Sequence, residues 1–157
     1  MSAVSGPLAI DEVAIDALQD VLTAEHAALW CYSLAVAFLS PARAEQARTD
    51  AEEHRELRSK VAQTLTEFGQ RPVSAQPAYA TPQPVEDGVS AAALVVVAET
   101  DAMAAWRSVL ERSTLPELRQ VALGTLTDTT VRCARWRAVL GLTPTIPVFP
   151  GRPTPPR

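Results

Sequence analysis

Residues 18–39, LQDVLTAEHAALWCYSLAVAFL, carry the pattern that decides the fold. Apolar residues recur here at alternating steps of four and three, which places them along one narrow face of a bundle helix. Glu25 lies within this otherwise apolar face. The helix is predicted over residues 11–39 and ends before Pro41, because proline disfavours helical geometry in the residue that precedes it. The face comprises Leu18, Leu22, Glu25, Leu29, Tyr32, Val36 and Leu39.

Three further helices are predicted from apolar spacing and from the turn residues between them. They cover residues 43–68, 90–112 and 115–140. Gly69 ends the second helix, Ser90 is the expected N-cap of the third, and residues 114–117 (TLPE) form a capping box that opens the fourth. Two inward faces remain open for the fourth helix: one through Leu118, Val121, Thr125, Asp128 and Arg132, the other through Leu118, Ala122, Thr129, Cys133 and Trp136.

Two proline-rich segments lie outside these helices. Residues 70–88 contain four prolines and no apolar period, so they form a connector, which in extended form is long enough to cross the whole bundle. Such a crossover allows the second and third helices to run parallel. Residues 142–157 form an extended tail, in which residues 146–149 are expected to lie in a groove of the same bundle or of a neighbouring subunit. The chain is therefore predicted to be one all-α domain over residues 1–157, a four-helix bundle with one long crossover.

Composition and charge exclude several functional classes. The net charge is −4 and Lys and Arg do not cluster, which argues against a surface for nucleic acid or anionic membrane. No apolar run approaches the length of a membrane span, and the first residues do not resemble a signal peptide. Cys31 and Cys133 lie in separate helices and are expected to be buried, reduced thiols. We therefore expect a cytoplasmic protein without nucleic-acid or membrane partners.

Each predicted helix brings one polar group into its inward region: Glu25, His54, Glu99 or Asp128. Glu25 precedes His54 by 29 residues, and Glu99 precedes Asp128 by the same number. The four groups are therefore expected at matching depth and to converge at mid-bundle, where helix bundles build metal sites. The equal spacing has two explanations that stay open, an internal duplication or helix pairs of equal length.

Several short motifs, in this order and spacing, resemble an actinobacterial ferritin-like domain family of unknown function. They are residues 24–28 (AEHAA), His54-Arg55, residues 77–79 (PAY) with Pro84-Val85, Glu99, Asp128 with Arg135-Trp136, and residues 149–151 (FPG). The similarity extends over nearly the whole chain. It implies a ferritin-like four-helix bundle and a homo-oligomer, with a dimer favoured, and it implies no established catalytic activity.

The residues leave two interpretations of the polar centre. Di-iron bundles supply a Glu-x-x-His motif from each of two helices, whereas Ala51 stands three residues before His54 and Val131 three residues after Asp128. Arg132 is a cation that could replace a metal ion and neutralise the carboxylates, leaving a structural ion-pair network. Alternatively, Glu25, His54, Glu99 and Asp128 hold a single iron, manganese or zinc ion.

Neighbouring polar residues have secondary roles in these interpretations. Glu53 is a possible further partner at the edge of the site, and Asp50 is a possible orienting carboxylate one turn before His54. His26 points about 100° away from Glu25 around the helix and is expected to lie outside the site.

The sequence therefore favours a non-catalytic structural or binding protein with a degenerate metal site and no cofactor. A metal-dependent oxidoreductase or metal carrier is the alternative. No phosphate-binding loop and no hydrolytic triad can be recognised.

Overall fold

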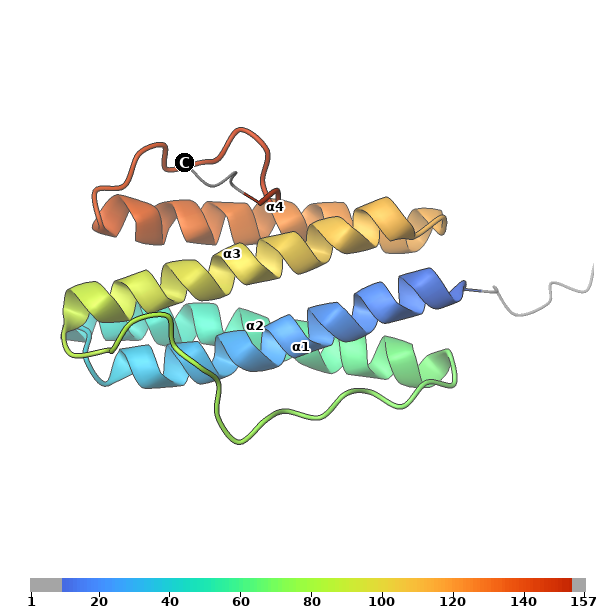
Figure 1. Cartoon of the computed structure of the whole chain (residues 1–157), viewed down its shortest axis with the longest axis horizontal. Helices are drawn as coiled ribbons and strands as arrows, with labels where there is room; N and C mark the ends of the chain where they lie inside the picture. The colour runs from blue at the N-terminus through green and yellow to red at the C-terminus, as the bar shows by residue number, and fades with distance from the viewer. Residues whose placement is uncertain (1–9, 154–157) are drawn as a thin grey trace, which may run out of the picture.

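The computed structural model describes residues 10–153, so both ends of the single domain predicted over 1–157 lie outside the described residues. The described part is a bundle of four helices without a strand, which confirms the predicted all-α class (Figure 1). The helices are α1 (Glu12–Val36), α2 (Pro41–Glu67), α3 (Gly88–Arg112) and α4 (Pro116–Val139). Their bounds agree with the predicted ones to within about three residues.

The connector after α2 runs back along the length of the bundle before α3 begins (Figure 1). As a result, α3 runs parallel to α2 and antiparallel to both α1 and α4, as the predicted crossover requires. The connector is held on α1 by Gln19, whose side chain donates to the Arg71 carbonyl and accepts from the Val73 amide, both at 2.9 Å. The rings of Trp30 and Tyr79 also lie 6.0 Å apart.

Two helix starts differ from the sequence predictions. Ser90 is not the N-cap of α3: Asp87 is, and Ser90 completes a capping box at the third helical position. The capping box predicted over residues 114–117 does not form, because α4 begins at Pro116 and its N-cap is Leu115. Thr114 therefore stands one position too early to bond the first free amides of the helix.

The hydrophobic core consists of two main clusters with a polar layer between them. One cluster contains Tyr32, Val95 and Trp136, and the other contains Leu22, Leu65 and Trp106. α4 faces the core mainly through the second of its two possible stripes. Its buried residues are Ala122, Thr125, Thr129, Thr130, Arg132, Cys133 and Trp136.

By length and composition, α3 is apolar enough to cross a membrane, although no uninterrupted apolar run suggested this. Half of the most apolar 18-residue stretch of α3 is buried inside the bundle, however, and α3 packs closely against both α1 and α4. A core helix with this environment is apolar for reasons of packing.

The tail after α4 turns back over α3 and α4 (Figure 1). It is fixed by Arg137, whose Nε donates to the Pro144 carbonyl at 3.0 Å, and by Arg107, whose Nη1 donates to the Pro150 carbonyl at 3.2 Å. Gly151 has φ +77°, and a Cβ there would lie 2.6 Å from the Met103 carbonyl oxygen, so only glycine fits.

The apolar side chains of the tail are nevertheless not buried. Ile146, Val148 and Phe149 are 54%, 81% and 57% exposed, so the prediction that they fill a groove of their own bundle is wrong. The tail is instead attached through its backbone carbonyls and Gly151, and these anchors leave the side chains between them facing outward. Burial against a neighbouring subunit stays a prediction.

Gly124 stands in the middle of α4, where a Cβ would meet no other atom within 4 Å. A glycine inside a helix costs roughly 0.5–1 kcal/mol relative to alanine. No contact among the described residues explains this choice.

Candidate functional site

Glu25, His54 and Glu99 meet in the polar layer between the two apolar clusters, and all three are fully buried. His54 lies between the carboxylates, with Nδ1 2.6 Å from Glu25 Oε2 and Nε2 2.8 Å from Glu99 Oε1. Both ring nitrogens face acceptors, so both carry protons and the ring is a cation. The structure thus brings together three of the four residues predicted to converge.

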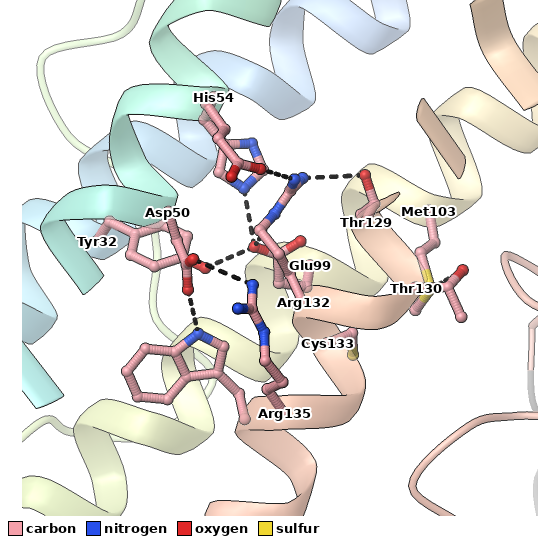
Figure 2. Close-up of polar contacts among 12 residues, drawn as sticks. Tyr32, Asp50, His54, Glu99, Met103, Thr129, Thr130, Arg132, Cys133 and Arg135 are labelled. Carbon is pink, nitrogen blue, oxygen red and sulfur yellow. Dashed lines mark hydrogen bonds and ion pairs between the residues drawn. The ribbon is translucent and has the colours of Figure 1, made fainter. Parts of the chain in front are cut away.

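Aromatic donors hold the two carboxylates in place. Trp106 Nε1 donates to Glu25 Oε1 at 2.8 Å, and the Tyr32 hydroxyl donates to Glu99 Oε1 at 2.5 Å. Figure 2 shows Tyr32 and His54 reaching Glu99 from different sides. Two donors at one carboxylate oxygen stabilise the ionised form of Glu99 in a medium of low polarity.

Arg132 enters the same layer from α4 and is 2% exposed. Its Nε donates to Glu99 Oε1 at 3.2 Å, its Nη1 to Glu53 Oε2 at 2.5 Å, and its Nη2 to Thr129 Oγ1 at 3.0 Å (Figure 2). Within this layer the fully buried charges are the carboxylates of Glu25 and Glu99, the imidazolium of His54 and the guanidinium of Arg132, which balance. Balanced and hydrogen-bonded charges are the form in which ions persist inside a protein.

Asp128 does not join the cluster, and its predicted convergence with the other three residues is wrong. It is exposed and lies near Lys60 at the mouth of a shallow groove on the outside of α2 and α4. The 29-residue spacing fixes height along the bundle but not the rotation of the helix about its own axis. That rotation is set by Ala122, Cys133 and Trp136, which are nearly fully buried and turn Arg132 inward in place of Asp128.

A second polar layer lies one helical turn away, centred on the buried Asp50. Trp136 Nε1 donates to Asp50 Oδ2 at 2.8 Å, and Oδ1 accepts from Gln46 at 2.8 Å and from Arg135 at 3.3 Å (Figure 2). Asp50 therefore binds Trp136 rather than orienting His54. Sequence reasoning missed this pair, although Asp50 precedes His54 by four residues and Trp136 follows Arg132 by four.

Burial and charge act in opposite directions on the buried ionisable groups. Burial lowers the pKa of His54, but hydrogen bonds to Glu25 and Glu99 outweigh it and raise this pKa from 6.5 to about 9. Burial raises the pKa of Glu99, yet its bonds to His54 and the charge of Arg132 bring it below its ordinary value. Burial also raises the pKa of Cys31 to about 11, so this thiol stays protonated at neutral pH.

The pKa of His54 predicts how stability depends on pH. Because the folded state holds this proton more tightly than the unfolded state, the stabilisation is complete below about pH 6.5 and is lost as pH rises toward 9. We expect the free energy of unfolding to fall by about 3 kcal/mol across this range. Urea unfolding between pH 6 and 9 measures it, and His54→Gln should remove the slope. An equal slope in that variant would contradict the assignment.

A model of the family described as "Domain of unknown function (DUF4439)" matches residues 17–154. The chain belongs to this family. The solved structure of a conserved hypothetical protein from Mycobacterium tuberculosis, rv2844, is similar to this DUF4439 chain, with 32% identity and a TM-score of 0.79. The similarity covers 88% of this chain and 97% of the mycobacterial one.

A ferritin-like, diiron-carboxylate protein from Bacillus anthracis str. Ames is also similar in structure, with a TM-score of 0.72 and 15% identity. The match covers 81% of this chain and 94% of that protein, and at this identity it establishes the ferritin-like fold alone. No curated protein matches the DUF4439 chain in sequence.

The residues of the polar layer do not fit a di-iron centre. Within residues 10–153, no three His, Cys, Asp or Glu side chains are arranged to hold a metal ion. Both nitrogens of His54 already face carboxylates, and Arg132 reaches Glu99 from the fourth helix. A metal ligand must give up its proton, whereas the raised pKa of His54 retains one.

Proposed function

We propose that this protein is a non-catalytic ferritin-like bundle whose polar layer is structural and whose surface serves self-association. The former position of a metal site is, on this proposal, filled by the cations of His54 and Arg132. Two protein cations in fixed positions neutralise Glu25 and Glu99 without any bound ion.

One observation carries the proposal: Glu99 Oε1 accepts from His54, Tyr32 and Arg132 at once. A metal ion at this oxygen would lie beside a guanidinium and an imidazolium, and repulsion between like charges disfavours this arrangement. Binding would also require His54 to lose a proton and one of its two bonds to a carboxylate. The layer is thus better suited to holding helices together than to exchanging ligands.

Elemental analysis after metal loading tests this proposal. The full chain is purified without chelator, incubated with Fe(II) under anaerobic conditions, Mn(II) or Zn(II), and freed of unbound metal by gel filtration. We expect less than about a tenth of an equivalent of each metal, because each ligand must first release its protein partner. The Bacillus anthracis protein, treated in parallel, is the positive control.

Stoichiometric metal that disappears in Glu99→Gln would overturn the proposal in favour of a metal site at this layer. The variant is matched in size and removes only the charge of the carboxylate. Metal retained equally by Glu99→Gln would point to another location in the chain, and the polar layer would keep its structural role.

One unsatisfied atom favours a second function, in which the protein binds a single metal ion as a carrier or an oxidoreductase. Glu99 Oε2 is buried and has no hydrogen-bond partner among the described residues. An unsatisfied carboxylate oxygen in the interior costs free energy, and a cation beside it would remove this cost. Glu25, His54 and Glu99 would be the ligands of iron, manganese or zinc, with Arg132 displaced.

The remaining parts of the proposal concern location and partners. The buried free thiols Cys31 and Cys133 fit a reducing compartment such as the cytoplasm. The net charge of −4 disfavours binding to nucleic acid or to an anionic membrane surface. Similarity to a mycobacterial protein supports an actinobacterial source. A homodimer is the assembly that we favour.

A further inference from the structure

The outward face of α4 is an uncharged stripe that runs almost the full length of the helix. It comprises Gln120, Gly124, Thr127, Val131, Ala134 and Ala138, spaced alternately by four and three residues. All are exposed except Ala134, which is half-buried. The outward face of α2, by contrast, carries charged residues along its length, including Arg48, Glu52, Arg55 and Glu56. Alternating steps of four and three are the spacing of a helix that packs lengthwise against another helix.

The stripe is complementary to itself about Val131. Gly124 and Ala138 stand seven residues before and after Val131, and Thr127 and Ala134 stand four before and three after. A twofold axis near Val131 would therefore pair small residues with small residues along two antiparallel copies of α4. Twofold symmetry places the same patch on both sides of an interface, as this pattern requires.

The charges beside the stripe follow the same symmetry. Asp128 and Arg135 lie seven residues apart on one flank of α4, three residues before and four after Val131. In an antiparallel pair of helices equal flanks meet, so Asp128 of one copy would face Arg135 of the other, twice. Asp128 forms no ion pair with another described residue, and the side chain of Arg135 is half exposed. Arg135 already donates through Nη2 to Asp50 at 3.3 Å, so its other guanidinium nitrogens would make this contact.

Gly124 gives an independent indication. Its surroundings are open, and its backbone does not require glycine, yet glycine weakens an isolated helix. Glycine and alanine at one face allow two helix backbones to approach closely. A partner helix therefore explains a residue that the single chain does not.

From these observations we infer that the outer face of α4 is the dimer interface, occupied by α4 of a second copy in antiparallel orientation. This rests on the self-association included in the proposed function. The stripe alone is ~27 Å long and ~10 Å wide, which falls short of the ~800 Å² per partner in a stable interface. The tail would add to this area, because Val148 lies beside Arg137 of α4, and Ile146 and Phe149 are exposed on the same segment.

Cysteine cross-linking tests the axis directly. Val131→Cys would place two thiols face to face, so mild oxidation should give a covalent dimer on a non-reducing gel. The native Cys31 and Cys133 are buried and do not compete. Ser59→Cys, on the exposed face of α2, is the matched control and should stay monomeric on the gel. Equal cross-linking of the two variants would overturn the proposed interface.

Sedimentation equilibrium of uncross-linked variants gives the second measurement. Val131→Glu places two like charges at the axis and should raise the dimer dissociation constant about 100-fold or more. Val89→Glu replaces an exposed valine on α3 and should leave the dissociation constant unchanged. Val148→Ser with Phe149→Ser should also weaken the dimer, whereas circular dichroism should show unchanged helix content in every variant.

The outcomes separate the interface from the broader proposal. A dimer that Val131→Glu does not weaken would refute this interface and leave self-association standing. A wild-type chain that is monomeric at all concentrations would refute both the interface and self-association. Neither outcome affects the metal analysis, which tests the polar layer by itself.

Discussion

Replacement of His54 by leucine is expected to lower the free energy of unfolding by about 3–5 kcal/mol. The change removes the one cation that faces both Glu25 and Glu99, and it leaves two buried carboxylates directed at an apolar side chain. This loss is a large part of the total stability of a domain and should lower the melting temperature by about 6–20 °C. Thermal and urea unfolding at pH 6.5, where the imidazolium is fully formed, measure it.

His26→Leu is the matched control, since His26 is the other histidine of the chain and lies one residue from Glu25. Its side chain has one hydrogen bond within residues 10–153, from Nε2 to the Val73 carbonyl at 3.1 Å, so its loss should cost about 1 kcal/mol. Adding Glu25→Gln to His54→Leu should recover part of the stability, because an amide carries no charge. If His54→Leu and His26→Leu were equally stable, the polar layer would not be the ionised network described above.

Arg132→Met is expected to have the second largest effect, again about 3–5 kcal/mol of destabilisation. Methionine replaces the volume of the side chain but not its charge, so Glu99 keeps His54 and Tyr32 and loses its third donor. Glu53 also loses its partner, but its side chain is half exposed and water replaces that contact. The measurement is denaturant unfolding at constant pH and ionic strength.

Arg135→Met tests whether burial causes this effect. Arg135 lies on the same helix and also contacts a buried carboxylate, Asp50, but its side chain is 51% exposed. Solvent screens such a pair, so we expect a loss of no more than about 1 kcal/mol. Combining Arg132→Met with Glu99→Gln should cost less than the sum of the single changes, because the unpaired charge is gone. Strict additivity would show that the two groups do not interact.

These variants together distinguish a structural network from an incomplete metal site. A structural network loses stability whenever one charge is removed, and it regains stability when the opposite charge is removed as well. A site retained for a ligand would instead gain stability from neutral substitutions, as active sites often do. The same set of proteins therefore serves both the stability measurements and the metal analysis.

The helices, the crossover and three of the polar residues could be predicted because each depends on a local signal. Apolar residues at helical spacing determine which side of α1 faces the core, and Pro41 marks the break between α1 and α2. Equal spacing along the chain placed Glu25, His54 and Glu99 at one height. A polar residue within an apolar stripe, such as Glu25, is a signal that sequence alone provides.

Asp128 shows that this kind of local pattern could not predict the inward face of α4. α4 carries apolar residues on several sides, including the exposed Val121, Leu123 and Val131, so periodicity could not select one inward face. The choice depends on which large side chain fills the space left by the other three helices. Trp136 fills it and donates to Asp50, 86 residues earlier in the chain. This contact turns Arg132 inward and Asp128 outward.

The sequence by itself determined the fold class, the order of the helices and the height of the polar layer, because propensity, spacing and proline positions act over a few residues. Only the tertiary structure decided the rotation of α4, the pairing of His54 with two carboxylates and of Asp50 with Trp136, and the outward direction of the tail side chains. Each of these results from packing and hydrogen bonding between segments far apart in the chain. The free energies of these contacts depend on all four helices at once, so a local sequence pattern cannot predict them.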